Sequence, residues 1–305
     1  MIPLINKQLI VCADDYAQNK SISEGIVRLA EQRRINAVSC MVNSQSWHEF
    51  NSSLHALEPT TFIGLHLNFT HGEALSSAWK KHYSTQFSDL PTLVKSAYRN
   101  RLNAEVVTAE MNAQIEAFTQ SMNAYPDFID GHQHIHQLPI IREALLANTY
   151  CHPREGGDPS LMQYEDSAEH GSPPLRGRQF TIRKTSNGWR DLFSTDGFPK
   201  RQMIALLGGI AFQHHLTQQS IPCNASFSGI YNFKHAANYR HYFKQFLTHS
   251  QDGGLIMCHP GNPSDDVSDP LHQCRHQELD YFLSDDYLRD VSEQSFQLRC
   301  KHHGH

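Results

Sequence analysis

Residues 8–42 read QLIVCADDYAQNKSISEGIVRLAEQRRINAVSCMV, and this stretch contains one complete unit of strand, helix and strand. The apolar run at residues 8–13 predicts a buried strand. A helix is expected from about Ser21 to Arg33, because Ser21 and Glu24 have capping-box spacing and apolar residues recur on one face. The second strand is expected at residues 37–42. Such a unit is typical of parallel strands joined by a crossover helix.

The same alternation continues along the chain and predicts an α/β fold. Further strands are expected at residues 62–67, 179–184, 225–227 and 254–258, with another opening at 128–129; helices are expected at 47–57, 105–124, 138–147, 202–216, 236–249 and 277–283. This number of strands favours a barrel.

Two stretches interrupt the pattern. Residues 151–178 contain several prolines and glycines without a helical or strand period, which predicts an exposed insertion. Residues 71–103 are also read as an irregular link. We therefore predict a single domain over residues 1–299, interrupted at 151–178, and a tail at 300–305 that we expect to be disordered.

The composition excludes several classes of protein. With 26 Lys and Arg against 31 Asp and Glu, the formal net charge is -5, so the chain offers no basic field for a nucleic acid. The longest apolar stretch, near residues 203–212, is about half of what a bilayer span requires. The N-terminus lacks the features of an export signal, and the seven cysteines include no C-x-x-C pair. We therefore expect a cytoplasmic protein without disulfides.

Acids and histidines follow three predicted strands. Asp14 and Asp15 end the first strand, His66 ends the third, and DGHQHIH at residues 130–136 follows the fourth. The carboxyl ends of parallel strands lie on one face of a sheet or barrel, so these side chains can converge there. A carboxylate with two imidazoles is a set that divalent metals accept. The sequence therefore predicts Asp15, His66 and His132 as ligands of one divalent cation, zinc or magnesium first, with manganese and cobalt left open.

Each of these signals has a structural alternative. Adjacent aspartates can cap the next helix, and a single histidine such as His66 is more often a hydrogen-bonded structural residue. The histidines at positions 132, 134 and 136 are the strongest local signal, because an extended chain places them on one face at intervals of about 7 Å. If one binds metal, we expect His134, His136 and Asp130 to orient water, substrate or the metal ligands.

A further histidine ends another predicted strand, in MCHPG at residues 257–261. Its position places His259 on the same face as the candidate ligands, which makes it a candidate proton donor. The alternative is a turn histidine in front of Pro-Gly.

Four segments, VCADDYAQN, IGLHLNFT, DGHQHIHQLP and IMCHPGNP, together resemble the motifs of the YdjC-like carbohydrate deacetylase family in order and spacing. The resemblance covers most of the chain. It implies a distorted TIM-like barrel and metal-dependent removal of acetyl groups from N-acetylated sugars, with chitooligosaccharides as the substrate type. A homodimer is a further family-level expectation.

By the same resemblance, Asp15, His66 and His132 are the implied metal ligands, Asp14 the general base and His259 the general acid. For contacts to the sugar we consider aromatic and polar side chains in loops at strand ends, namely Trp79, Tyr83, Arg183, Phe227 and Tyr231.

Two other readings remain open at this point. The His132-x-His134 pair also suits a metal-dependent amidohydrolase or phosphoesterase, although amidohydrolase barrels usually carry such a pair on the first strand. The second reading is a carbohydrate- or metal-binding protein that keeps the barrel without turnover.

Overall fold

The computed structural model describes residues 7–150, 181–188, 191, 199–233, 238–267 and 269–301. Residues 151–178, which the sequence predicts to be an insertion, lie outside the described residues, as do residues 302–305 of the predicted tail. In the described part of the chain, no helix combines the length and the apolar character that crossing a membrane requires.

The described strands form one eight-stranded sheet in which every pair is parallel, in the order β5-β4-β3-β2-β1-β7-β6, with β8 paired to the first residues of β1. The strands are β1 (Lys7–Tyr16), β2 (Ala37–Cys40), β3 (Phe62–Leu67), β4 (Phe128–Gly131), β5 (Thr181–Ile182), β6 (Phe227–Ser228), β7 (Leu255–Cys258) and β8 (Phe296–Leu298). This confirms the predicted α/β fold.

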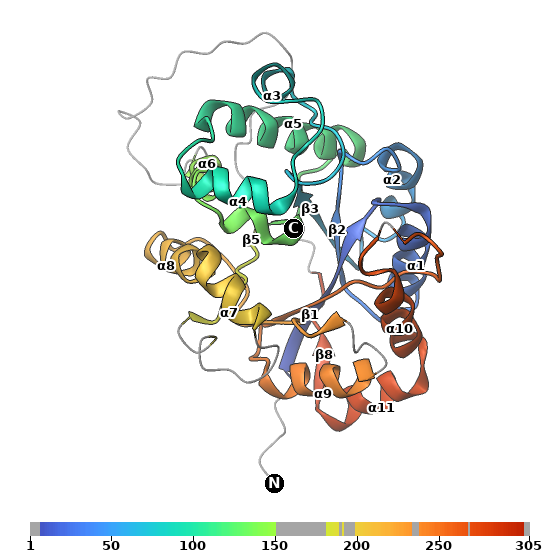
Figure 1. The fold of residues 1–305 in the computed structure, drawn as a ribbon. Helices are drawn as coiled ribbons and strands as arrows, with labels where there is room; N and C mark the ends of the chain where they lie inside the picture. Colours follow the sequence, from blue (N-terminus) through green and yellow to red (C-terminus); the bar gives the residue numbers. More distant parts are fainter. Residues whose placement is uncertain are drawn as a thin grey trace.

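The sheet curls toward closure. Between its two edge strands, β5 and β6, the segment 222–224 forms a parallel bridge from Cys223 to Ile182, and the Asn224 side chain accepts from the Lys184 backbone N–H at 2.9 Å. The result is a distorted barrel, and Figure 1 shows the helices arranged around its strands. The helical elements are α1 (Lys20–Glu31), α2 (Trp47–His55), α3 (Ser77–His82), α4 (Leu90–Tyr98), α5 (Ala104–Met122), η1 (His132–Gln137), α6 (Ile141–Tyr150), α7 (Lys200–Ile204), η4 (Ala205–Gly209), α8 (Ile210–Gln218), α9 (Tyr239–His249), α10 (His272–Leu283) and α11 (Asp285–Glu293).

The first unit folds as its pattern indicates, with one correction at the start of the helix. The N-cap of α1 is Asn19, whose side chain accepts from the Ile22 backbone N–H at 3.0 Å, and not Ser21. Ile22, Ile26 and Leu29 are fully buried, so the predicted apolar stripe is the face that packs on the sheet.

Other boundaries also differ from the prediction. The stretch 71–103, read as irregular, contains two short helices, α3 and α4, each capped by a side chain at its start, Ser76 and Asp89. The helix expected at 138–147 begins only at Ile141. In the predicted tail, the Lys301 ammonium lies 2.6 Å from the Asp127 carboxylate, which holds the chain at least to that residue.

Candidate functional site

The two adjacent aspartates both reach the barrel interior because β1 is irregular at this point. In a regular strand, neighbouring side chains point to opposite faces. The register of β1 against β2 shifts between Ala13 and Tyr16, and Asp15 has a positive φ of 67°. This bulge turns both carboxylates inward, and each is at most 2% exposed.

The three predicted ligands are brought together. Asp15 Oδ1 lies 2.9 Å from His132 Nδ1 and 3.4 Å from His66 Nε2. One donor atom from each residue can be chosen so that all lie within 4.8 Å of one another. They come from β1, β3 and the turn after β4, which are separate in sequence and adjacent in the sheet. A carboxylate and two imidazoles at this spacing fit one divalent cation.

His66 is oriented by its other nitrogen. Its Nδ1 lies 2.6 Å from Asp130 Oδ1, because His66 and Asp130 are register partners on β3 and β4. Ser39 on β2 donates to the same carboxylate oxygen at 2.5 Å. A metal-binding histidine commonly has its second nitrogen bonded to a carboxylate, which fixes the ring and its tautomer. The predicted supporting role of Asp130 thus has a geometric basis.

The charges in this cluster shift the proton affinities. Burial disfavours the charged form of His66, but Asp130 and Asp15 outweigh burial and raise its pKa to about 10. Burial would raise the pKa of Asp15, whereas Arg275 and His132 hold it well below its usual range. Asp15 is therefore ionised at neutral pH, as a metal ligand must be.

Asp14 is held by a buried arginine. The Arg183 guanidinium donates to both Asp14 oxygens, Nη1 to Oδ2 at 2.7 Å and Nη2 to Oδ1 at 2.6 Å, and it also pairs with Asp130. Burial of Asp14 opposes ionisation, yet Arg183 lowers its pKa to about 2. Cys12, Asp14 and Asp130 could also hold a cation by their spacing, but this guanidinium already lies among them, with Nη2 3.0 Å from Cys12 Sγ.

His259 lies at the end of β7. Its backbone N–H donates to Glu278 Oε2 at 2.6 Å, and the Tyr231 hydroxyl donates to Glu278 Oε1 at 2.6 Å. Burial lowers the pKa of His259 to about 4, against the attraction of Asp15 and Asp14. Its Nδ1 is buried without a partner in the described part of the chain. The ring therefore has a nitrogen free to exchange a proton, close enough to the two aspartates for their charges to act on its pKa.

The prediction of an extended histidine run is wrong. Residues 132–137 form a short 3₁₀ helix, η1, in which Gln133 and His134 have positive φ. Only His132 faces Asp15. His134 packs edge-on against the Phe227 ring, and His136 Nε2 lies 3.0 Å from the Arg183 carbonyl oxygen. Because the chain turns tightly after Gly131, the three rings point to different neighbours.

Burial limits the side chains considered for sugar contact. Arg183, Phe227 and Tyr231 are each 1% exposed, and Trp79 is 4% exposed against Phe69 and Phe87. Tyr83 is 38% exposed, and its hydroxyl accepts from the Asn103 backbone N–H. Arg183 and Tyr231 therefore act on neighbouring side chains, Asp14 and Glu278, and present almost no surface to a sugar.

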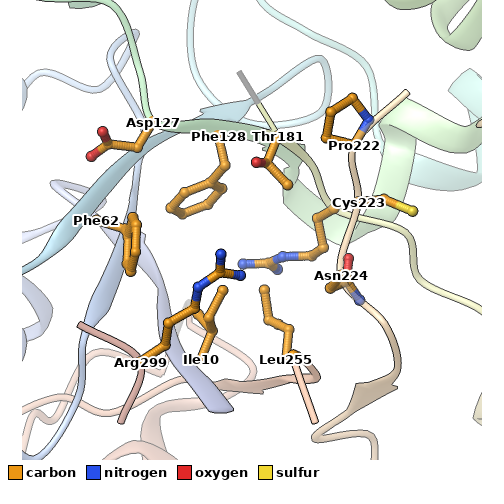
Figure 2. Close-up of a pocket in the computed structure, with 12 residues that line it drawn as sticks. Ile10, Phe62, Asp127, Phe128, Thr181, Pro222, Cys223, Asn224, Leu255 and Arg299 are labelled. Atoms are coloured by element: carbon orange, nitrogen blue, oxygen red, sulfur yellow. The ribbon is translucent and has the colours of Figure 1, made fainter. Parts of the chain in front are cut away.

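A cavity of about 370 Å³ lies at the opposite end of the barrel. Figure 2 shows the side chains that surround it. The residues at or near the starts of strands line it, among them Ile10, Phe62, Phe128, Thr181 and Leu255. The candidate ligands lie at the other ends of the strands. This cavity is therefore not the metal centre, although Arg183 borders both.

Three site residues have no counterpart in the sequence prediction, namely Ser39, Arg275 and Glu278. Arg275 Nη2 donates to Asp15 Oδ2 at 2.9 Å, from helix α10 near the C-terminus of the chain. Arg275 and Glu278 lie in one helix and are both buried in the structure. Buried charged side chains are usually paired, so both are expected to have internal partners. Nothing in the sequence indicates which partners they are.

The model of the protein family described as "YdjC-like protein" matches residues 8–293 of this chain. Among curated proteins, the chitooligosaccharide deacetylase of Proteus mirabilis is 27% identical over 200 residues, which is 62% of this chain and 66% of that protein. The carbohydrate deacetylase of Mus musculus is 32% identical over 149 residues, 46% of this chain and 47% of that protein. The matches thus span about half to two thirds of the curated relatives.

A solved structure shares the fold over nearly the whole chain. It is a crystal structure of a protein from Enterococcus faecalis, described as a proposed cellobiose-phosphate cleavage protein, with a TM-score of 0.64 and 17% identity over 97% of each chain. At this identity the likeness establishes the fold alone, and it agrees with the distorted barrel described above.

Proposed function

Since the chain belongs to the YdjC-like protein family, we propose that it is a metal-dependent carbohydrate deacetylase acting on N-acetylated sugars of the chitooligosaccharide type. The observation that carries the proposal is the convergence of Asp15, His66 and His132 at the carboxyl ends of the strands, with Asp14 and His259 beside them.

Asp15, His66 and His132 would hold one divalent cation. When bound, such a cation polarises the acetyl carbonyl and lowers the pKa of a water molecule from about 15.7 toward 7. Asp130 keeps His66 in the tautomer that directs Nε2 at the site. The barrel interior supplies the low-dielectric surroundings that strengthen these interactions.

Asp14 is the proposed acceptor of the proton from the attacking water. Arg183 keeps it ionised near neutral pH and fixes the plane of its carboxylate, because each oxygen accepts one N–H of the guanidinium fork. Each oxygen retains a lone pair for the water. Arg183 is thus a positioning residue for the base, and it does not contact the sugar.

His259 is the proposed donor to the leaving amine. A pKa of about 4 means that its ring is neutral at pH 7, so it must gain a proton during the reaction before it can donate one. The proposed source is the proton that Asp14 removes from water. The C–N bond then breaks as the amine nitrogen is protonated, which yields acetate and the free amino sugar.

The test measures acetate released from diacetylchitobiose by the metal-loaded protein and, in parallel, the bound metal. We expect His66→Ala to lose metal and activity, and Asp14→Asn and His259→Ala to keep one metal per chain while turnover falls by about 10²–10⁴-fold. Loss of metal in His259→Ala would contradict its role as an acid. Release of phosphate from a model phosphoester without any acetate would favour a phosphoesterase instead.

A further inference from the structure

The two oxygens of Asp15 have different partners. Oδ1 faces His132 Nδ1 at 2.9 Å and His66 Nε2 at 3.4 Å, so it is the oxygen on the cation side. Oδ2 accepts from Arg275 Nη2 at 2.9 Å. Because Oδ2 is turned toward Arg275, Oδ1 is the Asp15 oxygen that lies beside the two histidines.

Arg275 is itself fixed from outside the cluster. Its Nε donates to Asp269 Oδ2 at 2.6 Å, and its Nη2 lies 3.4 Å from Asp269 Oδ1. Both side chains are at most 5% exposed. The position of the guanidinium is thus set by a carboxylate that is not one of the candidate ligands.

The backbone around Arg275 is also tightly packed. Its carbonyl oxygen accepts from the Gly261 backbone N–H at 3.2 Å, and a Cβ added to Gly261 would lie 3.3 Å from Arg275 Cδ. On its other side, Gly261 packs on Gly25 of α1, where an added Cβ would lie 2.9 Å from Gly261 Cα. The backbone of α10 is therefore closely packed against the barrel at this residue, and the contacts to Asp269 hold the guanidinium at its end of the side chain.

We infer that Arg275, anchored by Asp269, selects the metal by keeping Asp15 a one-oxygen ligand. This inference rests on the proposed function, since it assumes that Asp15 binds a cation. Zinc is satisfied by few ligands and accepts nitrogen and single carboxylate oxygens. Manganese is harder, favours carboxylate oxygens and takes more of them. A clamped Asp15 therefore favours zinc over manganese.

The charge of Arg275 acts in the same direction. A guanidinium bonded to Oδ2 neutralises part of the carboxylate charge, and this weakens the attraction that a hard cation depends on most. Zinc depends less on this charge, because it also binds well to the two histidine nitrogens.

The experiment titrates metal-free, full-length protein with ZnCl₂ and with MnCl₂ by calorimetry. The quantity compared is the ratio of the Kd for manganese to the Kd for zinc. We expect this ratio to fall about tenfold in Arg275→Gln and about threefold in Asp269→Asn, which keeps the arginine and removes its anchor. The matched control is Arg289→Gln, which removes a guanidinium that is 66% exposed and pairs with Asp286 at the surface.

A second readout reports the coordination directly. Cobalt absorbs strongly in the visible range when four-coordinate and weakly when its coordination number is higher. If Asp15 is freed to bind through both oxygens, the cobalt-loaded Arg275→Gln protein should absorb more weakly than the wild type. This spectrum does not depend on turnover.

An unchanged ratio and an unchanged cobalt spectrum in folded Arg275→Gln would overturn the inference. If circular dichroism shows that Arg275→Gln does not fold, the same Kd ratio is measured in Asp269→Asn and Arg275→Lys. Arg275→Lys keeps the positive charge and loses the forked guanidinium, so an unchanged ratio in both variants would overturn the inference. Wild-type protein that binds no metal would overturn the proposed function itself, whereas wild-type binding with unaltered ratios in the variants overturns only the selection by Arg275.

Discussion

Replacement of Arg183 by Met should destabilise the protein strongly at neutral pH. Arg183 is 1% exposed and pairs with Asp14 and Asp130, which are 2% and 0% exposed. The variant would leave the two buried carboxylates of Asp14 and Asp130 without the guanidinium that pairs with both of them. Removing one partner of a buried ion pair typically costs about 3–5 kcal/mol, and we expect a loss in this range at pH 7.

The pKa of Asp14 predicts how the loss of stability in Arg183→Met changes with pH. In the wild type the pKa of Asp14 is about 2, below its ordinary value of 3.8, so its contribution is present above pH 3.8 and is lost as the pH falls toward 2. This contribution alone is roughly 2 kcal/mol. Without Arg183, burial instead raises the pKa of Asp14. As the pH falls, Asp14 takes up a proton, and the destabilisation caused by its buried negative charge disappears. The difference between variant and wild type should therefore shrink from pH 7 to pH 4.

The assay is urea unfolding followed by far-ultraviolet circular dichroism, with EDTA present, at several values between pH 4 and pH 7. Arg289→Met is the control, since its exposed ion pair should contribute at most about 1 kcal/mol at any pH. A loss below about 1 kcal/mol for Arg183→Met at pH 7, or a loss that does not change with pH, would refute this account of the buried cluster.

Three further outcomes are expected. Gly131→Ala should lower stability by about 1–3 kcal/mol, because the new Cβ would lie 2.8 Å from His136 Nδ1; an unchanged melting temperature would contradict this. Asp130→Asn should weaken metal binding about 10–100-fold in calorimetry, because His66 loses the carboxylate that orients it, and wild-type affinity would exclude that role. Burial raises the pKa of Glu278 from 4.5 to about 7, so wild-type stability should fall by roughly 3 kcal/mol as the pH rises through this range. Glu278→Gln should lack that slope in urea unfolding, and the same slope in both proteins would show that Glu278 does not titrate there.

The strand-end positions of the proposed ligands were predictable because parallel pairing has few solutions. The third strand was expected at residues 62–67, and β3 has these bounds. Once β3 and β4 pair in parallel with His66 opposite Asp130, the histidine and its carboxylate partner must meet. The convergence of Asp15, His66 and His132 follows from this topology, together with the bulge in β1.

The remainder of the site could not be predicted from local pattern. Alternating histidines suit a strand, but the chain turns after Gly131 and brings His136 close to it, through positive φ at Gln133 and His134, which are not glycines. Arg275 is 260 positions from Asp15 in sequence. Its neighbours on α10 indicate burial without naming the acid that it contacts, so the contact with Asp15 becomes visible only when α10 is placed beside the first strand.

The charges of the cluster support the proposed cation among these side chains. Asp14, Asp15 and Asp130 supply three negative charges, and the buried guanidiniums of Arg183 and Arg275 balance two of them. Part of the Arg275 charge is in turn opposed by Asp269, so the balance stays negative. The raised pKa of His66 is the response to this excess, since its proton brings a positive charge between Asp130 and Asp15. The ring nitrogens of His66 and His132 both lie near a single oxygen, Asp15 Oδ1. A divalent cation bound there would also bring positive charge and would displace the proton from His66, so cation and proton compete for one position.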